Sequence, residues 1–430
     1  MGRKIWWCGL AAAALLAPAM ACAATHPQFD VEAATRAYLD LLQGPARAKS
    51  DAYFEGGYWL TLWGTLVAVA VDWMLLGGRF SARFRDWSAR LVKWRWLVPA
   101  VYAVPFTIAS TLISLPWTIY TGFIREKQYG LMSQSFAGWA GEQAIDLGVG
   151  IVVNVILLTV LFAAIRRFRR TWWLWGAATL TAFFAFDLLI GPVFLAPLFN
   201  SYTELPAGPV RDKIVAMARA NNVPAENIYL FDASKQSKRI SANVSGIGPT
   251  IRISLNDNLL NRTGPDEVAA AMGHELGHYV LGHFWRLFGE VALICLAVFG
   301  AIYALTPRIL ARWGARWGVR DVADPAVTPL LALMAAVAGL GLTPIENSIG
   351  RTEEVEADVF GLNAAREPDG FAKVAMRLSE YRKIEPGRFE EFFFFDHPSG
   401  ANRVRMAMQW KKDHVPGATM VKPDLKLDGQ

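Results

Sequence analysis

The sequence predicts a predominantly α-helical polytopic membrane protein that also has polar regions outside its membrane spans. Hydrophobic residues make up 53% of the chain and charged residues only 19%. Several apolar stretches are long enough to cross about 30 Å of hydrocarbon. A third observation is the sequence His-Glu-Leu-Gly-His at 274–278, an HExxH motif, preceded by short strand-like segments. Together these features predict about six to seven transmembrane helices and a zincin-type domain that contains a small β-sheet.

The amino-terminal segment, residues 1–24, predicts either a signal peptide or a first membrane span. Arg3 and Lys4 precede an apolar run, which ends in the small residues Ala21, Cys22, Ala23 and Ala24. A charged start, an apolar centre and a small-residue end are typical of secretory signals. Both interpretations place the following residues, 25–57, outside the cytoplasm.

The remaining spans divide into two groups separated by a polar region. The sequence predicts an N-terminal membrane domain of about four spans in 25–198 and two further spans in 284–346. The stretches are 58–78, 96–120, 145–165, 172–198, 284–305 and 328–346, the last of them shorter and interrupted by glycine.

Three arginine-rich loops predict the orientation in the membrane. They occupy 79–95, 166–170 and 308–320, and the positive-inside rule places all three in the cytoplasm. The region 199–283, with the HExxH motif, is therefore predicted to be periplasmic or extracellular. These loops account for the net charge of +6, so the sequence does not predict nucleic-acid binding. All three cysteines lie in apolar segments, which argues against a disulfide framework and against cysteine ligands to a metal.

The HExxH motif predicts two metal ligands and a base. His274 and His278 are four residues apart, so on a helix both rings can turn toward one cation. Glu275 lies beside that position, where it can take a proton from bound water. The alternative is two helix histidines without a metal. His283 is excluded as a third ligand because five residues past His278 is about 140° round a continuous helix, so its ring is predicted to point elsewhere.

The polar region before the motif predicts a helix followed by short strands. The helix covers 210–221, and the strands cover 227–231, 241–245 and 250–255, the last with the alternation of a half-buried strand. A strand edge beside a metal-binding helix can pair with an extended substrate backbone, although a purely structural hairpin fits equally well. Gly277 allows either another backbone or a substrate to approach closely, or simply tight packing.

The third ligand is expected in the second polar region, 347–430. Zinc accepts a carboxylate as third ligand and keeps a fourth position for water. Glu353, Glu354 and Glu356 all compete for that role, and an acidic start of a helix is the alternative for each. Glu354 and Asp358 are four residues apart and can share a helix face.

The chain resembles the type I CAAX prenyl protease family, integral-membrane zinc endopeptidases with HExxH and a downstream ExxxD. The resemblance covers about 35–412. It is carried by these further segments: Leu115–Tyr120, Arg125–Gly130, Pro197–Asn200 with Leu205-Pro206, Ser234-Lys235, and His397-Pro398-Ser399 with Arg403. It implies a ring of helices around an intramembrane chamber, capped by the zinc domain.

The resemblance also implies roles for individual residues. His274, His278 and Glu354 would bind one zinc ion per chain, with Glu275 as general base. The remaining implied roles are orientation of a ligand histidine by Asp358, stabilisation of the oxyanion by His397, support of that corner by Arg403, and contact with the substrate backbone by Asn243. The residues after Asn243, Val244 and Ser245, depart from the Asn-Ala-aromatic run that is usual in the family.

The predicted function is that of a zinc-dependent metalloendopeptidase that is embedded in the lipid bilayer and acts on a peptide or protein substrate. Eukaryotic family members place the zinc domain in the cytosol, whereas the arginine-rich loops here place it outside. This difference, with the export-like amino terminus, predicts a bacterial inner-membrane relative, for which prenylated CAAX proteins are not the expected substrate.

Two other functions compete with this one, and the oligomeric state stays open. One is an envelope quality-control protease with the same chemistry. The other is a non-proteolytic scaffold or transporter with a structural zinc, whose mark would be intramembrane charges such as Asp72 and Asp187.

Overall fold

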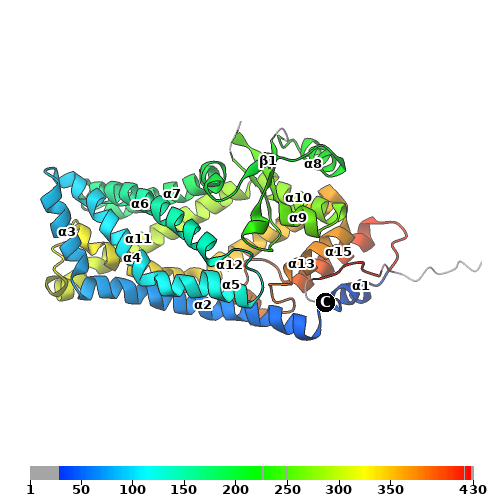
Figure 1. Cartoon of the computed structure of the whole chain (residues 1–430), viewed down its shortest axis with the longest axis horizontal. Coiled ribbons are helices and arrows are strands. Elements are labelled where there is room, and N and C mark those ends of the chain that lie inside the picture. The colour runs from blue at the N-terminus through cyan, green and yellow to red at the C-terminus, as the bar shows by residue number, and fades with distance from the viewer. Residues whose placement is uncertain (1–28, 225–226, 247–249, 421, 428–430) are drawn as a thin grey trace, which may run out of the picture.

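The computed structural model describes residues 29–430 except 225–226, 247–249, 421 and 428–430. The predicted signal peptide or first span at 1–24 lies outside the described residues. The molecule is elongated, with long helices at one end and the sheet, α10 (Pro265–Val280) and the short carboxy-terminal helices at the other (Figure 1). Its described helices and strands confirm the predicted fold class.

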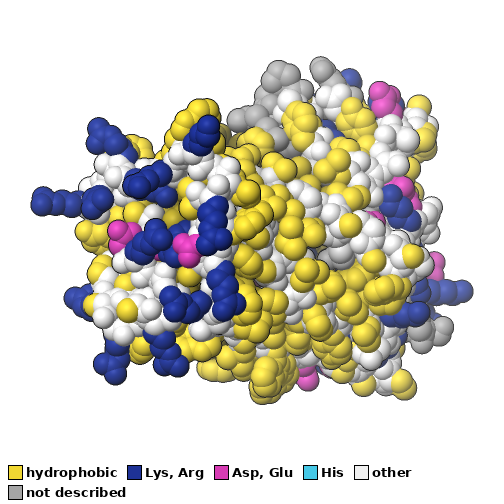
Figure 2. Space-filling model, turned by 60° about the vertical axis from the view of Figure 1, so that its left-hand side comes forward, with side chains coloured by type: hydrophobic (Ala, Val, Ile, Leu, Met, Phe, Trp, Pro, Cys, Tyr) yellow, Lys and Arg dark blue, Asp and Glu magenta, His cyan; other side chains and the backbone are white. Residues whose placement is uncertain are grey.

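Six described helices are long and apolar enough to cross a membrane, which confirms the predicted number after residue 57. They are α2 (Gly44–Gly77), α4 (Val98–Ile119), α6 (Phe136–Arg167), α7 (Trp172–Phe194), α11 (His283–Trp317) and α12 (Thr328–Ala365). A π-helical turn extends α4 into α5 (Arg125–Gln128). Figure 2 shows hydrophobic side chains over the middle of the surface, as expected where lipid replaces water.

The last span was predicted to be short and glycine-broken, and this was wrong. Helix α12 runs for 38 residues and passes Gly339, Gly341 and Pro344 without a break. Proline and glycine are tolerated in membrane helices because their surroundings stabilise the freed backbone groups. One continuous helix therefore joins a membrane span to the acidic segment that contains Glu354.

The three basic loops meet at the end of the molecule away from α10. Arg166 Nη1 donates to the carbonyl oxygen of Arg95 at 3.0 Å, and Arg85 Nη1 donates to that of Gly318 at 3.0 Å. Figure 2 shows Lys and Arg side chains crowded at this end. The helix α3 (Phe80–Leu91) lies here and contributes Ala82 to a hydrophobic core that includes Tyr102, Phe162 and Trp172.

A buried ion pair holds this basic end together, and its loss is expected to be costly. Arg85 and Asp324 are 6% and 5% exposed, and Arg85 Nη1 donates to Asp324 Oδ2. Asp324→Ala leaves the guanidinium buried without its carboxylate, so the free energy of unfolding should fall by about 3–5 kcal/mol. Asp86→Ala removes a partner of Arg85 that is 46% exposed, so it should cost at most about 1 kcal/mol. Unfolding in detergent measures both, and equal losses would contradict this account.

The sheet has four strands in the order β1-β2-β4-β3. They are β1 (Tyr202–Glu204), β2 (Ile228–Phe231), β3 (Ala242–Ser245) and β4 (Arg252–Asn256); β2 and β4 are parallel, and the other two pairs are antiparallel. All five residues of β4 are buried, so the prediction of a half-buried strand was wrong. At the start of β4, the guanidinium group of Arg252 lies over the ring of Tyr202 from β1, 4.5 Å from its centroid. The two outer strands are β1 and β3, and the four residues of β3 are half-buried.

Short helices complete the part of the molecule around the sheet. They are α1 (Val31–Leu39), α8 (Pro209–Ala220), α9 (Asp257–Arg262), α10 (Pro265–Val280), α13 (Pro368–Leu378), α14 (Arg388–Phe394) and α15 (Gly400–His414). One hydrophobic core joins residues of the two polar regions: Ile253 and Leu276 from the first pack with Ala365 and Val374 from the second.

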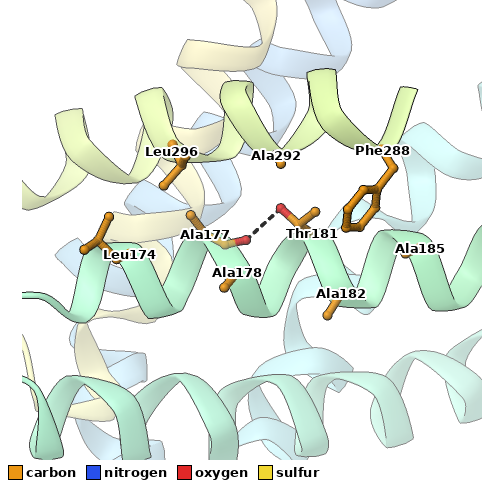
Figure 3. Close-up of a pocket in the computed structure, with 9 residues that line it drawn as sticks. All are labelled: Leu174, Ala177, Ala178, Thr181, Ala182, Ala185, Phe288, Ala292 and Leu296. Carbon is orange, nitrogen blue, oxygen red and sulfur yellow. Dashed lines mark hydrogen bonds between the residues drawn. The ribbon is translucent and has the colours of Figure 1, made fainter. Parts of the chain in front are cut away.

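An apolar crevice of about 500 Å³ lies between α7 and α11, within the span region. Small side chains such as Ala177, Ala182 and Ala292 line it, and Thr181 Oγ1 donates to the carbonyl oxygen of Ala177 (Figure 3). None of its lining residues is a predicted site residue or carries a charge. The crevice is therefore separate from the residues that the sequence predicts to form a site.

Candidate active site

The HExxH motif lies in α10, whose first turn is fixed by charged and backbone contacts. Glu267 Oε2 accepts the N–H of Gly264 at 2.7 Å, and Arg377 of α13 pairs with the same carboxylate. Asp266 pairs with Lys373 at 2.9 Å. Burial alone would raise the pKa of Asp266, but the hydrogen bond from Lys373 outweighs it and lowers the pKa. Both carboxylates in the first turn of α10, those of Asp266 and Glu267, therefore have charged partners.

Glycine lets α10 and α12 approach each other closely. A Cβ atom on Gly361 would lie 2.7 Å from the backbone nitrogen of His274, and one on Gly277 would lie 3.1 Å from the Cα atom of Ala357. The sequence left open why residue 277 is glycine, and the structure shows that the backbone of α12 approaches it closely at Ala357. The close approach brings the acidic face of α12 against the two motif histidines.

Gly361→Ala is expected to push these helices apart. The added methyl group meets backbone rather than a movable side chain, so the free energy of unfolding should fall by about 1–3 kcal/mol, and bound metal should be lost at equal chelator concentration. Gly339→Ala in the same helix is the matched control, because a Cβ there meets nothing within 4 Å. Melting temperature and metal content measure the two effects. A Gly361→Ala protein that matches the control in both would contradict the role of this contact.

His274, His278 and Glu354 converge as a possible metal site among the described residues. His274 Nε2 lies 3.3 Å from Glu354 Oε2, His278 Nε2 lies 3.4 Å from Glu354 Oε1, and the two Nε2 atoms are 3.1 Å apart. Of the three competing glutamates, only Glu354 faces this point. Glu356 pairs with Arg286 instead, and Glu353 is buried with an oxygen that has no hydrogen-bond partner.

The residues present fit a tetrahedral cation. Ligands about 2.1 Å from a tetrahedral zinc lie roughly 3.4 Å from one another, which is close to the separations observed here. Glu354 Oε2 is buried without a hydrogen-bond partner, and a buried carboxylate oxygen of this kind is costly unless something else binds it. Two imidazoles and one carboxylate are also a donor set that zinc accepts with a fourth position left open.

Asp358 fixes the orientation of His274. Its Oδ1 lies 2.7 Å from His274 Nδ1, and it is fully buried. Burial alone would lower the pKa of His274, but the nearby carboxylates of Asp358 and Glu354 outweigh it and raise the pKa to about 10. Arg403 Nη2 donates to the same Asp358 oxygen. The structure thus places Arg403 behind Asp358, where it balances the charge of that carboxylate.

Glu275 and His397 lie around the same point. Glu275 is half-buried on α10; burial raises its pKa, although the nearby His274 and His278 oppose this effect. His397, between α14 and α15, has Nε2 3.3 Å from Glu354 Oε2 and Nδ1 2.8 Å from the Asp396 carboxylate. Its ring therefore joins the site from a segment more than a hundred residues away in the chain.

Asn243 lies on β3, one of the two outer strands of the sheet. It is in register with Ser254 of β4 and accepts a hydrogen bond from Ser245 Oγ at 3.3 Å. Strand β3 also packs against α10. Asn243 is therefore positioned beside the motif helix, but none of its contacts within the described chain is with the converging residues.

His283 contacts His278, and the sequence did not predict this contact. Its ring was predicted to point away from His278, and this was wrong: the two Nδ1 atoms are 2.9 Å apart. The prediction assumed a continuous helix, whereas α10 ends at Val280 and Gly282 adopts a left-handed conformation with φ of 69°. The signal in the sequence was Gly282 itself, since glycine four residues after His278 marks a helix end.

Comparison with known proteins agrees with this architecture. The model of peptidase family M48 matches residues 204–411, and that of the CAAX prenyl protease N-terminal region, with five membrane helices, matches residues 38–201. An uncharacterized metalloprotease of Bacillus subtilis, YhfN, is 28% identical over 81% of this chain and 83% of its own length. CAAX prenyl protease 1 of Saccharomyces cerevisiae is 25% identical over 69% of this chain and 68% of its own.

A solved structure shares the fold. The crystal structure of Ste24p from S. mikatae superposes with a TM-score of 0.72 at 19% identity, and covers 88% of this chain and 95% of its own. The two family models together account for most of the sequence, from the first spans to α15. The chain therefore belongs to the M48 metallopeptidases, among the membrane-embedded relatives of CAAX prenyl protease 1.

Proposed function

We propose that this protein is a zinc-dependent membrane metalloendopeptidase with one zinc ion per chain. The observation that carries the proposal is the convergence of His274 Nε2, His278 Nε2 and both oxygens of Glu354 on one point, with Glu275 on the same helix. Family membership supports a metal-dependent peptidase, and the donor set favours zinc.

The protein residues would then divide the chemistry. His274, His278 and Glu354 would hold the zinc ion, which would supply Lewis-acid chemistry to polarise the peptide carbonyl and make water a stronger acid. Glu275 accepts the proton from the attacking water and passes it to the leaving amine nitrogen. Asp358 accepts from His274 Nδ1, which leaves Nε2 free to act as ligand. His397 Nε2 donates to the carbonyl oxygen as negative charge develops on it.

Strand β3 supplies a place for the substrate backbone. It is one of the two outer strands of the sheet, it pairs with β4 along one side, and it packs against α10. An extended peptide can add to such an edge through main-chain hydrogen bonds, with the Asn243 amide as an additional contact. Two open recesses, of about 440 and 320 Å³, flank α12 on the membrane side of the site. They offer room for the parts of a substrate beyond the scissile bond.

We place the active site on the periplasmic side of a bacterial inner membrane. The basic loops that contact one another lie at the end opposite to α10, and such loops stay in the cytoplasm. Alkaline phosphatase fused to the carboxy terminus tests this orientation, because it folds to an active form only outside the cytoplasm. Phosphatase activity supports the proposed side, and an inactive but stable fusion contradicts it.

The non-proteolytic alternative is less well supported by the intramembrane charges. Asp72 is buried in α2, and Asp187 is exposed on α7. Within the described part of the chain neither carboxylate has an ion-pair partner, and they lie on different helices. They do not outline a shared charged pathway of the kind expected for a transporter.

Cleavage assays separate the functions that remain. Detergent-purified protein is incubated with a quenched unmodified peptide and with its farnesylated counterpart, with and without a zinc chelator. Chelator-sensitive cleavage supports the peptidase, and a single dominant site would favour processing over quality control. The relatives named CAAX prenyl protease 1 make the farnesylated peptide the necessary comparison. Silence of zinc-loaded protein toward both peptides and toward an unfolded membrane protein would contradict the proposal.

A further inference from the structure

His278 has a second nitrogen that the proposed chemistry does not use. Its Nε2 faces Glu354 and His274, whereas its Nδ1 faces away from them, 2.9 Å from His283 Nδ1. His283 is the first residue of α11 and is only 3% exposed. The two rings are tilted by 74° with their centroids 5.0 Å apart, so they meet at their edges, as a hydrogen bond requires.

The contact continues from His283 to a charged pair. His283 Nε2 lies 3.2 Å from Glu356 Oε2 on α12. Arg286, one turn along α11, donates to both oxygens of Glu356, at 2.9 and 3.4 Å. Four side chains from α10, α11 and α12 therefore form one connected chain, which starts at His278 and ends at the guanidinium group.

Only one arrangement of protons among neutral rings satisfies every link. If Nε2 of His278 binds a cation, its Nδ1 carries the proton and must donate. His283 Nδ1 then accepts, which puts the His283 proton on Nε2, where it is donated to the Glu356 carboxylate. Arg286 donates to that carboxylate in turn. The hydrogen bonds among the first three residues thus all run away from the cation.

We infer that His283 is a positioning residue: it holds the ring of His278 in the orientation that presents Nε2 to zinc, with Glu356 selecting the tautomer of His283 that can accept. The inference rests on the proposed function, since it requires His278 to be a zinc ligand. The two proposed ligand histidines would then be held in place by different kinds of hydrogen-bond partner. His274 is held by the buried carboxylate of Asp358, whereas His278 is held by an imidazole that is itself anchored to two membrane helices.

The test measures zinc affinity rather than cleavage. His283→Leu keeps bulk but removes the acceptor, so the Kd for zinc, from competition with a chelator, should rise about 10- to 100-fold. His283→Asn restores an acceptor near the position of Nδ1 and should recover most of that loss. His414→Leu, at the exposed end of α15, is the matched histidine control and should leave the Kd unchanged. The visible spectrum of the cobalt-substituted protein should change in His283→Leu but not in His414→Leu, because His278 is no longer held in one orientation.

Two further variants keep the inference falsifiable. Glu356→Ala removes a side chain that is 39% exposed, so the variant should fold, and its zinc Kd should rise about 2- to 10-fold. Wild-type Kd and cobalt spectrum in Glu356→Ala, or in a folded His283→Leu, would overturn the inference. His278→Ala distinguishes a failure of the proposed zinc site from a failure of the role of His283. If it also binds zinc like the wild type, the proposed function fails; if it loses zinc while the other two do not, only the role of His283 fails.

Discussion

Glu275→Gln is expected to lower the rate of peptide cleavage by about 10²- to 10⁴-fold while the protein keeps its zinc. Glutamine has the same shape as glutamate but cannot accept a proton from water. Glu275 is on α10 beside both motif histidines, and burial raises its pKa, which makes the carboxylate a stronger base than an exposed one. Because Glu275 is not among the three converging residues, its replacement should leave metal binding intact.

The measurement compares kcat for one quenched peptide in the wild type and in Glu275→Gln, with zinc content determined on the same samples. Melting temperature serves as the control for folding. A variant that cleaves at the wild-type rate would rule out Glu275 as the base. A variant that has lost its zinc would show instead that the carboxylate supports the metal site.

Glu354→Gln is expected to remove the metal and, with it, all cleavage. Both oxygens of Glu354 face the motif histidines, at 3.3 and 3.4 Å, and the carboxylate supplies the only negative charge among the three converging residues. An amide oxygen is a much weaker ligand, since zinc sites of this kind use a carboxylate. After dialysis against a chelator, the variant should retain less than one tenth of the wild-type zinc, which corresponds to a loss of about 1.4 kcal/mol or more.

Glu353→Gln is the matched control for this prediction. It makes the same chemical change one residue earlier on α12, at a side chain that is not among the three converging residues. It should keep its zinc and its cleavage rate. If Glu353→Gln loses zinc and Glu354→Gln does not, the third ligand has been assigned to the wrong glutamate.

Much of the fold could be predicted because it depends on local signals. Hydrophobic length alone located six spans, and a helix and three strands were expected close to their observed bounds. The continuity of α12 could not be predicted in this way. Pro344 and two glycines lower helix propensity in any window, and only the membrane and the neighbouring helices make an unbroken helix favourable.

In the candidate site, too, the features that depend on local spacing could be predicted and those that depend on helix packing could not. The spacing of His274 and His278 places both on one helix face by geometry alone. The choice among Glu353, Glu354 and Glu356 depends on the rotation of α12 about its axis. Contacts at Gly361 and Gly277 set that rotation, and no periodicity in the sequence reveals them. His283 was misjudged because a single glycine ended the helix on which its direction had been calculated.

The central claim is that one zinc ion, held by His274, His278 and Glu354, makes this protein a peptidase. The most direct test is a zinc titration of the chelated protein, with cleavage of a quenched peptide followed at each addition. Activity should be absent at the start, should rise in proportion to added zinc, and should stop rising at one equivalent per chain. Full activity before any zinc is added, or a rise that continues well beyond one equivalent, would contradict the claim.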